Sequence, residues 1–151
     1  MTKHYFEDFE EGLTKEAGAY EVTKDEIIEF GKRFDPQPYH VDEEVAKEVF
    51  GGLIASALHT LSICQRIVTD NLFQGTVTKA GAGFESVQCT APVYAGDTLS
   101  VRMEIIEKKE LESYPDRGLV RVQYTALNQN DEEVLSTVAL PFFERRSAQE
   151  S

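Results

Sequence analysis

The residues best suited to chemistry lie in the segment FDPQPYH, residues 34–40. This segment places the carboxylate of Asp35 and the imidazole of His40 five residues apart, in a stretch that Pro36 and Pro38 stiffen. Because histidine titrates near pH ~6.5, a carboxylate and an imidazole held together can move protons near neutral pH. Aspartate before proline is also common in exposed turns, so the spacing alone is equally compatible with a structural loop.

A second candidate feature begins where Gly51 and Gly52 precede a strongly apolar stretch. Ala55, Ser56 and Ala57 would form the first turn of a helix there. The first N–H groups of a helix lack partners within it and carry a partial positive charge, which suits a developing oxyanion. The alternative is that the glycines only join two helices and that the small residues allow close packing.

Three short segments would position this pair. Thr23 and Glu26 form the capping-box pattern T-x-x-E, which predicts a helix from there to about Phe34. The two prolines disfavour helix in the residues that precede them, so an extended loop is predicted over residues 35–40. A short amphipathic helix is predicted over residues 42–50, where the glycine pair ends it.

The most apolar segment, residues 54–72, is predicted to form one long helix. Its apolar residues recur at the spacing of a single helical face. Since Ile63 and Ile67 widen this stripe, we expect the helix to be covered on most sides and central in the fold. The stripe consists of Ile54, Ala57, Leu58, Leu61, Cys64, Val68 and Leu72.

The second half of the chain alternates apolar and polar residues with the two-residue period of strands. Turn sequences separate the strands, so they should pair antiparallel, and a sheet of five or more strands with one long helix is an α+β architecture. The predicted strands cover residues 17–22, 83–90, 101–105, 120–126 and 134–143. The predicted buried face of the last strand is Val134, Val138, Leu140 and Phe142.

Composition limits the class of protein. The 151 residues suit a single domain over residues 1–151. The chain has 15 basic and 27 acidic side chains, a net charge of −12, so nucleic acid and membrane surfaces are not expected partners. The N-terminal segment lacks an apolar signal core. Cys64 and Cys89 form no metal-binding pattern, which predicts reduced thiols, a cytoplasmic location and no metal site.

The stretch FDPQPYHVDEEVAKEVFGGLIASALHT, with the later APVYAGDTL, resembles the MaoC-like family of (R)-specific enoyl-CoA hydratases and acyl dehydratases. This family has the hot-dog fold, an antiparallel sheet wrapped around a long helix. The resemblance implies that Asp35 and His40 activate water and shuttle a proton at the substrate's α-carbon. It also implies that the N–H of Ala57 binds the thioester oxygen. The chain departs from the family pattern where Gln37 replaces Asn and where Ser56 and Ala57 replace His-Gly.

The other expected substrate contacts surround the same helix start. They are Ser56, Gly52, Ile54 and His59. His59 lies one helical turn beyond Ser56, although a helix histidine can equally bond to a neighbouring side chain. The implied substrate is acyl-CoA or another acyl thioester, with no cofactor. Because a single wrapped sheet has open edges, we expect a homodimer or a dimer of dimers, with substrate near the subunit boundary.

Three functions are compatible with these residues. The first is addition or removal of water on a 2-enoyl/3-hydroxyacyl thioester by Asp35 and His40. The second is thioester hydrolysis, for which hot-dog enzymes more often rely on one carboxylate. The third is acyl-thioester binding without catalysis, which the Ser56-Ala57 departure keeps open. The basic residues that could contact coenzyme A phosphates, or simply end strands, are Lys108, Lys109, Arg117, Arg121, Arg145 and Arg146.

Overall fold

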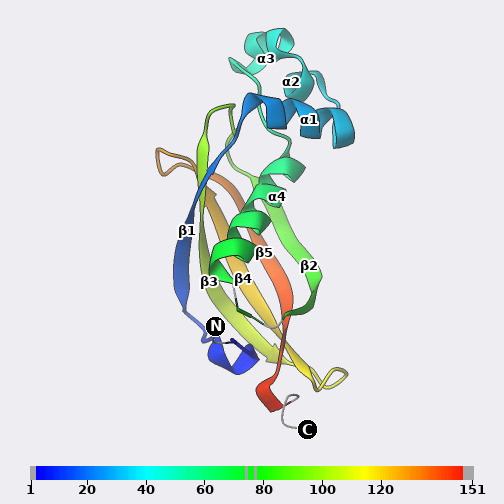
Figure 1. Cartoon of the computed structure of the whole chain (residues 1–151), viewed down its shortest axis with the longest axis vertical. Coiled ribbons are helices and arrows are strands. Elements are labelled where there is room, and N and C mark those ends of the chain that lie inside the picture. Colours follow the sequence, from blue (N-terminus) through cyan, green and yellow to red (C-terminus); the bar gives the residue numbers. More distant parts are fainter. Residues whose placement is uncertain (1–2, 74, 77, 148–151) are drawn as a thin grey trace.

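The computed structural model of the protein describes residues 3–73, 75–76 and 78–147. A sheet curves around one central helix, and three other helices cluster at one end of the sheet (Figure 1). The 3₁₀ turn η1 and the end of the last strand lie at the opposite end. The helical elements are η1 (Phe6–Asp8), α1 (Lys24–Phe34), α2 (Pro38–Val41), α3 (Glu43–Phe50), α4 (Ala57–Ile67) and the π-helical turn η2 (Val68–Leu72).

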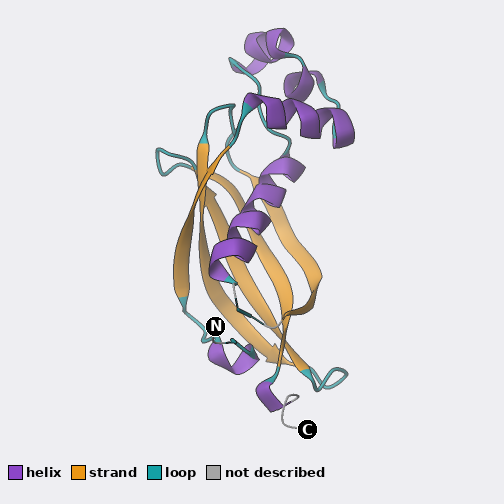
Figure 2. Ribbon diagram, viewed as in Figure 1, coloured by secondary structure: helices purple, strands orange, loops and turns teal. Residues whose placement is uncertain are grey.

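The sheet contains five strands in the order β1-β3-β4-β5-β2, and each neighbouring pair is antiparallel. The helix α4 lies along one face of it (Figure 2). The strands are β1 (Thr14–Glu21), β2 (Thr78–Cys89), β3 (Thr98–Glu110), β4 (Arg117–Leu127) and β5 (Glu133–Glu144). The predicted α+β class and the hot-dog arrangement of sheet and helix are therefore confirmed.

The core lies between α4 and the sheet. Every second residue is buried from Leu99 to Ile105 in β3 and from Gly118 to Ala126 in β4, as the two-residue period of a strand requires. These side chains form one hydrophobic cluster with Ile63, Cys64 and Ile67 of α4. Each fully buried aliphatic side chain contributes about 1.5–3 kcal/mol to stability. The core thus fixes α4, and with it the start of this helix, against the sheet.

The buried face of β5 differs from the prediction. The pattern predicted that Val138, Leu140 and Phe142 would be buried, but all three are only partly buried. The prediction was wrong because apolar residues occupy both faces of this strand, so alternation alone does not decide which face meets the helix. The buried residues of β5 are Val134, Leu135, Thr137, Ala139, Phe143 and Glu144.

The long helix is shorter and less covered than predicted. It begins at Ala57 because Ser56 is its N-cap, and the preceding Ile54 instead forms a β-bridge with Tyr94. Regular α-helix ends at Ile67, and a π-helical turn follows. Leu58 remains 57% exposed, since the sheet of one chain covers only one side of the helix. None of the described helices is long and apolar enough to span a membrane.

The segment predicted as an extended loop contains a short helix, α2. The prediction is correct for Asp35 and Gln37, whose backbone angles are not helical and which each precede a proline. It is wrong from Pro38 onward. Proline is favoured at the first position of a helix, where its missing N–H has no intrahelical partner, so Pro38 begins a helical turn that includes His40.

Strand β2 is an exposed edge of the sheet. Most of its residues are exposed, including the large apolar side chains of Phe84 and Val87. Its pairing with β5 contains three register shifts, and Ala80 and Ser86 have positive φ angles of 69° and 51°. The strand is therefore irregular and carries apolar surface that this chain does not cover.

The two cysteines are free thiols in different environments. Burial raises the pKa of Cys64 to about 12, and partial desolvation also raises the pKa of Cys89, which is exposed on β2. Because the thiolate is the reactive form, burial makes Cys64 inert.

We expect one rapid and one blocked thiol. In the folded protein at mildly alkaline pH, a chromogenic disulfide reagent should modify Cys89 and leave Cys64 unmodified until denaturant is added. Cys89→Ser is the control and should abolish the rapid phase. Rapid modification of both thiols without denaturant would show that the core around Cys64 opens.

Candidate functional site

The first site residue, Asp35, lies at the end of α1. The side chain of Thr23 accepts a hydrogen bond from the Glu26 N–H at 3.2 Å and so caps the start of this helix, as predicted. At the other end, the Asp35 N–H donates to the Gly31 carbonyl at 2.8 Å, and Pro36 prevents further helix. The Asp35 side chain is about 30% exposed. A carboxylate is thus held at a helix end and remains accessible.

The second site residue, His40, is fixed by its surroundings. It is 5% exposed, and its Nδ1 lies 2.6 Å from the carbonyl oxygen of Ile54. A carbonyl only accepts, so Nδ1 carries the hydrogen and Nε2 of the neutral ring has a free lone pair. The segment is held close to α1, since a Cβ on Gly31 would lie 3.0 Å from the His40 Cβ. The imidazole therefore has one tautomer and one orientation.

These two residues meet at the start of α4. His40 Nε2 lies 3.4 Å from Asp35 Oδ2, and the Ser56 hydroxyl donates a hydrogen bond to the same oxygen at 2.8 Å. Ser56 is buried, and its Oγ also accepts from the Leu58 N–H at 3.3 Å. One serine thus caps α4 and binds the carboxylate at the end of α1. An acid–base pair beside a helix N-terminus can transfer a proton next to a group that accepts negative charge.

Ala57 is the first residue of α4. Its N–H has no partner within the helix for that reason, and it carries the partial positive charge of the helix start. Ala57 is exposed and directly follows Ser56, which binds Asp35. A residue whose N–H is unpaired within the helix thus directly follows the serine that binds Asp35.

Two other predicted substrate contacts, Ile54 and Gly52, have different positions relative to the pair. Ile54 contributes its carbonyl as the anchor of His40, and its own N–H donates to the Tyr39 carbonyl at 3.2 Å. Gly52 lines a separate hollow of about 280 Å³, together with Lys47 and Tyr94. The structure therefore brings Ile54 to the pair through its backbone and does not bring Gly52 to it.

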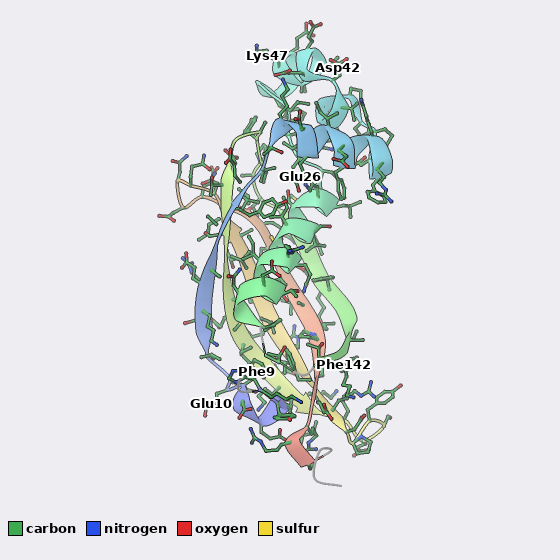
Figure 3. The ribbon with its side chains drawn as sticks, in the orientation of Figure 1. Phe9, Glu10, Glu26, Asp42, Lys47 and Phe142 are labelled. Atoms are coloured by element: carbon green, nitrogen blue, oxygen red, sulfur yellow. The ribbon has the colours of Figure 1, made fainter. Side chains whose placement is uncertain are left out.

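His59 contacts α1 and does not contact Asp35 or His40. Its Nε2 lies 3.1 Å from Glu26 Oε1, and its ring stacks on that of Phe30 with centroids 4.7 Å apart. Figure 3 shows Glu26 between α1 and the start of α4. The same Oε1 atom accepts a hydrogen bond from the Tyr20 hydroxyl at 2.5 Å, which raises the pKa of Tyr20 to about 12. These contacts join β1, α1 and α4.

Sequence reasoning missed Glu26 and Tyr20 as members of this second cluster. Glu26 was assigned only to the helix cap, and Tyr20 to a strand. No local pattern links them to His59, because the three residues belong to different elements. A carboxylate four residues before Phe30 on an apolar helix face was the available signal.

Four of the six basic residues proposed as phosphate contacts are engaged in ion pairs. Arg145 and Arg146 bind Glu7 and Asp8, respectively, and Arg121 binds Glu85. Arg117 binds its neighbour Asp116, while Lys108 lies over the ring of Phe6.

The described residues contain no group of three or more His, Cys, Asp or Glu side chains placed to hold a metal ion.

Comparison with known proteins identifies the family of this chain. The family model of the MaoC-like domain matches residues 10–128. The chain is 33% identical over 129 residues to the uncharacterized protein YdeM of Bacillus subtilis, covering 85% of this chain and 90% of that protein. It is 31% identical over 140 residues to the 3-hydroxybutyryl-CoA dehydratase of Methylorubrum extorquens, covering 90% and 82%. The crystal structure of a MaoC-like dehydratase from Rhodospirillum rubrum superimposes with a TM-score of 0.84 at 35% identity, covering 95% and 98%.

The close approach of Gly31 to His40 generates a prediction. Replacing glycine by alanine inside a helix ordinarily stabilises a protein by about 0.5–1 kcal/mol. Here the methyl group would crowd His40 and Val41, and overpacking costs about 1–3 kcal/mol. Gly31→Ala should therefore lower the free energy of unfolding in urea. Lys32→Ala, at an exposed neighbouring position, is the control, and a Gly31→Ala variant more stable than the wild type would contradict the close packing.

Proposed function

Because this chain belongs to the MaoC-like domain family, we propose that it adds water to, or removes water from, 2-enoyl/(R)-3-hydroxyacyl thioesters such as acyl-CoA. The observation that carries this proposal is the joint contact of His40 and Ser56 with one oxygen of Asp35 beside the first N–H of α4. The family membership itself places the chain among hydratases and dehydratases.

In the proposed reaction, Asp35 and His40 act as one acid–base unit on a water molecule. The Nδ1–H of His40 is committed to the Ile54 carbonyl, so Nε2 and Asp35 Oδ2 are the two groups that can accept a proton. The water oxygen bonds to the β-carbon, one O–H bond breaks and its proton passes to the pair. The pair then returns a proton to the α-carbon. Dehydration is the reverse, and neither direction changes an oxidation state of the protein.

The N–H of Ala57 would bind the thioester oxygen. Negative charge develops on this oxygen as the α-carbon becomes carbanion-like, and a fixed donor at a helix start stabilises that charge. Removal of one such donor typically reduces the rate by about 10²–10³-fold. A backbone donor does not depend on the side chain, so alanine in place of glycine preserves it.

The contacts favour this reaction over the two alternatives. A protein that only binds thioesters has no need of a buried imidazole whose tautomer is fixed and whose free nitrogen faces a carboxylate. A thioesterase that relies on one carboxylate would equally leave His40 without a role. The arrangement of His40 at 3.4 Å from Asp35 is explained by shared proton transfer.

We further propose that two copies associate through surfaces that one chain leaves open. The edge strand β2 exposes Phe84 and Val87, and α4 exposes Leu58 beside the acid–base pair. Unpaired strand edges with apolar side chains readily pair with a second copy. Association there would cover α4 and place the substrate near the subunit boundary.

Light scattering at micromolar concentration should therefore give at least twice the chain mass of 17.0 kDa. Val87→Lys should shift the protein toward the monomer, because it places a charge on the exposed edge strand. Lys15→Glu on the opposite edge strand β1 is the control. A monodisperse monomer in the wild type would refute the association.

Substitution of the pair tests the catalytic proposal. Asp35→Asn and His40→Gln should each reduce the rate of enoyl-CoA hydration by about 10²–10⁴-fold. Because the two act as a unit, the double variant should be scarcely slower than either single one. The measurement is the loss of conjugated enoyl absorbance with thioesters of increasing chain length.

Matched controls are Asp25→Asn and His4→Gln, at exposed positions outside the site. His40→Gln should also destabilise the protein by about 1–3 kcal/mol, since the residue is buried and bonded to Ile54. Rates must therefore be compared per folded molecule. Activity of Asp35→Asn within about threefold of the wild type would end the assignment.

A further inference from the structure

The geometry of the acid–base pair depends on how α1 packs against α4, two helices that are not consecutive in the chain. Asp35 ends α1 and Ser56 begins α4, so the 2.8 Å bond between them requires that these two helix ends stay in register. His40 reaches the same carboxylate from α2. A small slide of α1 along α4 would separate Asp35 from both partners.

His59 is the α4 side chain that holds α1 at a second point. It lies three residues after Ser56, one turn along the same helix. On α1, Glu26 and Phe30 are four residues apart and lie on one face, and His59 binds the carboxylate of the first and stacks on the ring of the second, with an interplanar angle of 8°. One imidazole thus fixes both the position and the rotation of α1.

The same α1 face leads directly to the site. Phe30 packs against Phe34, with ring centroids 5.0 Å apart, and Phe34 precedes Asp35. At the other end, the Tyr20 hydroxyl binds Glu26 and so ties this network to β1. A continuous set of contacts therefore runs from the sheet through Glu26 and His59 to the helix end that carries Asp35.

Stability alone does not explain a histidine here. His59 is 2% exposed, and its Nδ1 has no hydrogen-bond partner among the described residues. Burying an unpaired polar nitrogen is unfavourable, and leucine would fill similar space without that penalty. His59 also contacts neither Asp35 nor His40, so it has no direct role in proton transfer.

We propose, on the basis of the function proposed above, that His59 is a positioning residue that keeps Asp35 aligned with Ser56 and His40 by holding α1 on α4. It acts through Glu26 and Phe30 and touches no reacting atom. Misplacement of a reacting group by about 1 Å can reduce a rate by about 10²-fold, so a helix clamp of this kind affects turnover strongly.

The test compares His59→Leu with the wild type. We expect the thermal midpoint to change little, because removal of a buried unpaired nitrogen offsets loss of the bond to Glu26. We expect kcat per folded molecule to fall about 10–100-fold while KM stays within about twofold. His59→Gln, which retains an N–H donor toward Glu26, should recover part of the lost kcat. Ser62→Ala, one turn further along α4 at an exposed position, is the control and should leave both constants unchanged.

A double-mutant cycle separates positioning from general stability. If His59 acts through the Ser56–Asp35 bond, the loss of kcat in His59→Leu/Ser56→Ala should be smaller than the product of the two single losses. Independent, multiplicative losses would show that His59 acts by another route and would overturn the proposal.

A structural measurement keeps this proposal separate from the proposed function. In a crystal structure of His59→Leu, the Ser56 Oγ to Asp35 Oδ2 distance should increase from 2.8 Å to beyond about 3.5 Å. An unchanged distance would refute the positioning role, whatever the protein catalyses. Absence of hydratase activity in the wild type would instead refute the proposed function, and the distance would still decide the role of His59. If His59→Leu fails to fold, His59→Met, which also lacks an N–H donor toward Glu26, provides the same comparison.

Discussion

The hydrogen bond from Ser56 to Asp35 joins two helix ends that lie 21 residues apart in the chain. Everything in the site is arranged around it. The same hydroxyl accepts from the Leu58 N–H, so α4 cannot begin elsewhere without loss of the carboxylate's partner. The bond places the carboxylate next to Ala57, the residue whose N–H has no partner within the helix. Two hydrogen bonds of one serine thereby cap α4 and hold the carboxylate of Asp35 at the start of this helix.

The imidazole of His40 is controlled by backbone atoms. A main-chain carbonyl only accepts hydrogen bonds, so the 2.6 Å bond to Ile54 specifies the tautomer of the neutral ring. Ile54 is itself held by the Tyr39 carbonyl and by its bridge to Tyr94. The imidazole of His40, which faces Asp35, is therefore oriented directly by the backbone of Ile54 and not by another side chain. This is the arrangement that proton transfer in a fixed geometry requires.

A separate polar cluster lies toward the start of α1. There the Glu26 carboxylate binds Tyr20 and His59, and the Phe30 ring packs on the imidazole. Two carboxylate–imidazole pairs thus occur within one helical region, but only the Asp35–His40 pair lies beside the exposed start of α4. Their different surroundings support the different roles proposed for them, proton transfer for the first pair and holding α1 on α4 for the second.

Much of the fold was predictable from the sequence. The alternation in β3 and β4 and the apolar stripe of α4 each reflect one buried face, which a local pattern records. The pattern failed in β5, where both faces are apolar and Val138 and Leu135 are equally plausible core residues. It failed again at Pro38. Proline disfavours helix in the residue before it but is favoured at the first position of a new helix, and Pro38 begins α2.

The sequence by itself determined the chemical groups of the site: a carboxylate and an imidazole on one proline-rich segment, followed by a helix start with small residues. Only the tertiary structure decided that Ser56 binds Asp35, that Ile54 acts through its carbonyl, and that Gly52 and His59 lie away from the pair. The reason is that residue types and local periodicity are properties of short segments. Hydrogen bonds between α1, α2 and α4 depend instead on how these helices pack, which the buried core of the whole chain sets.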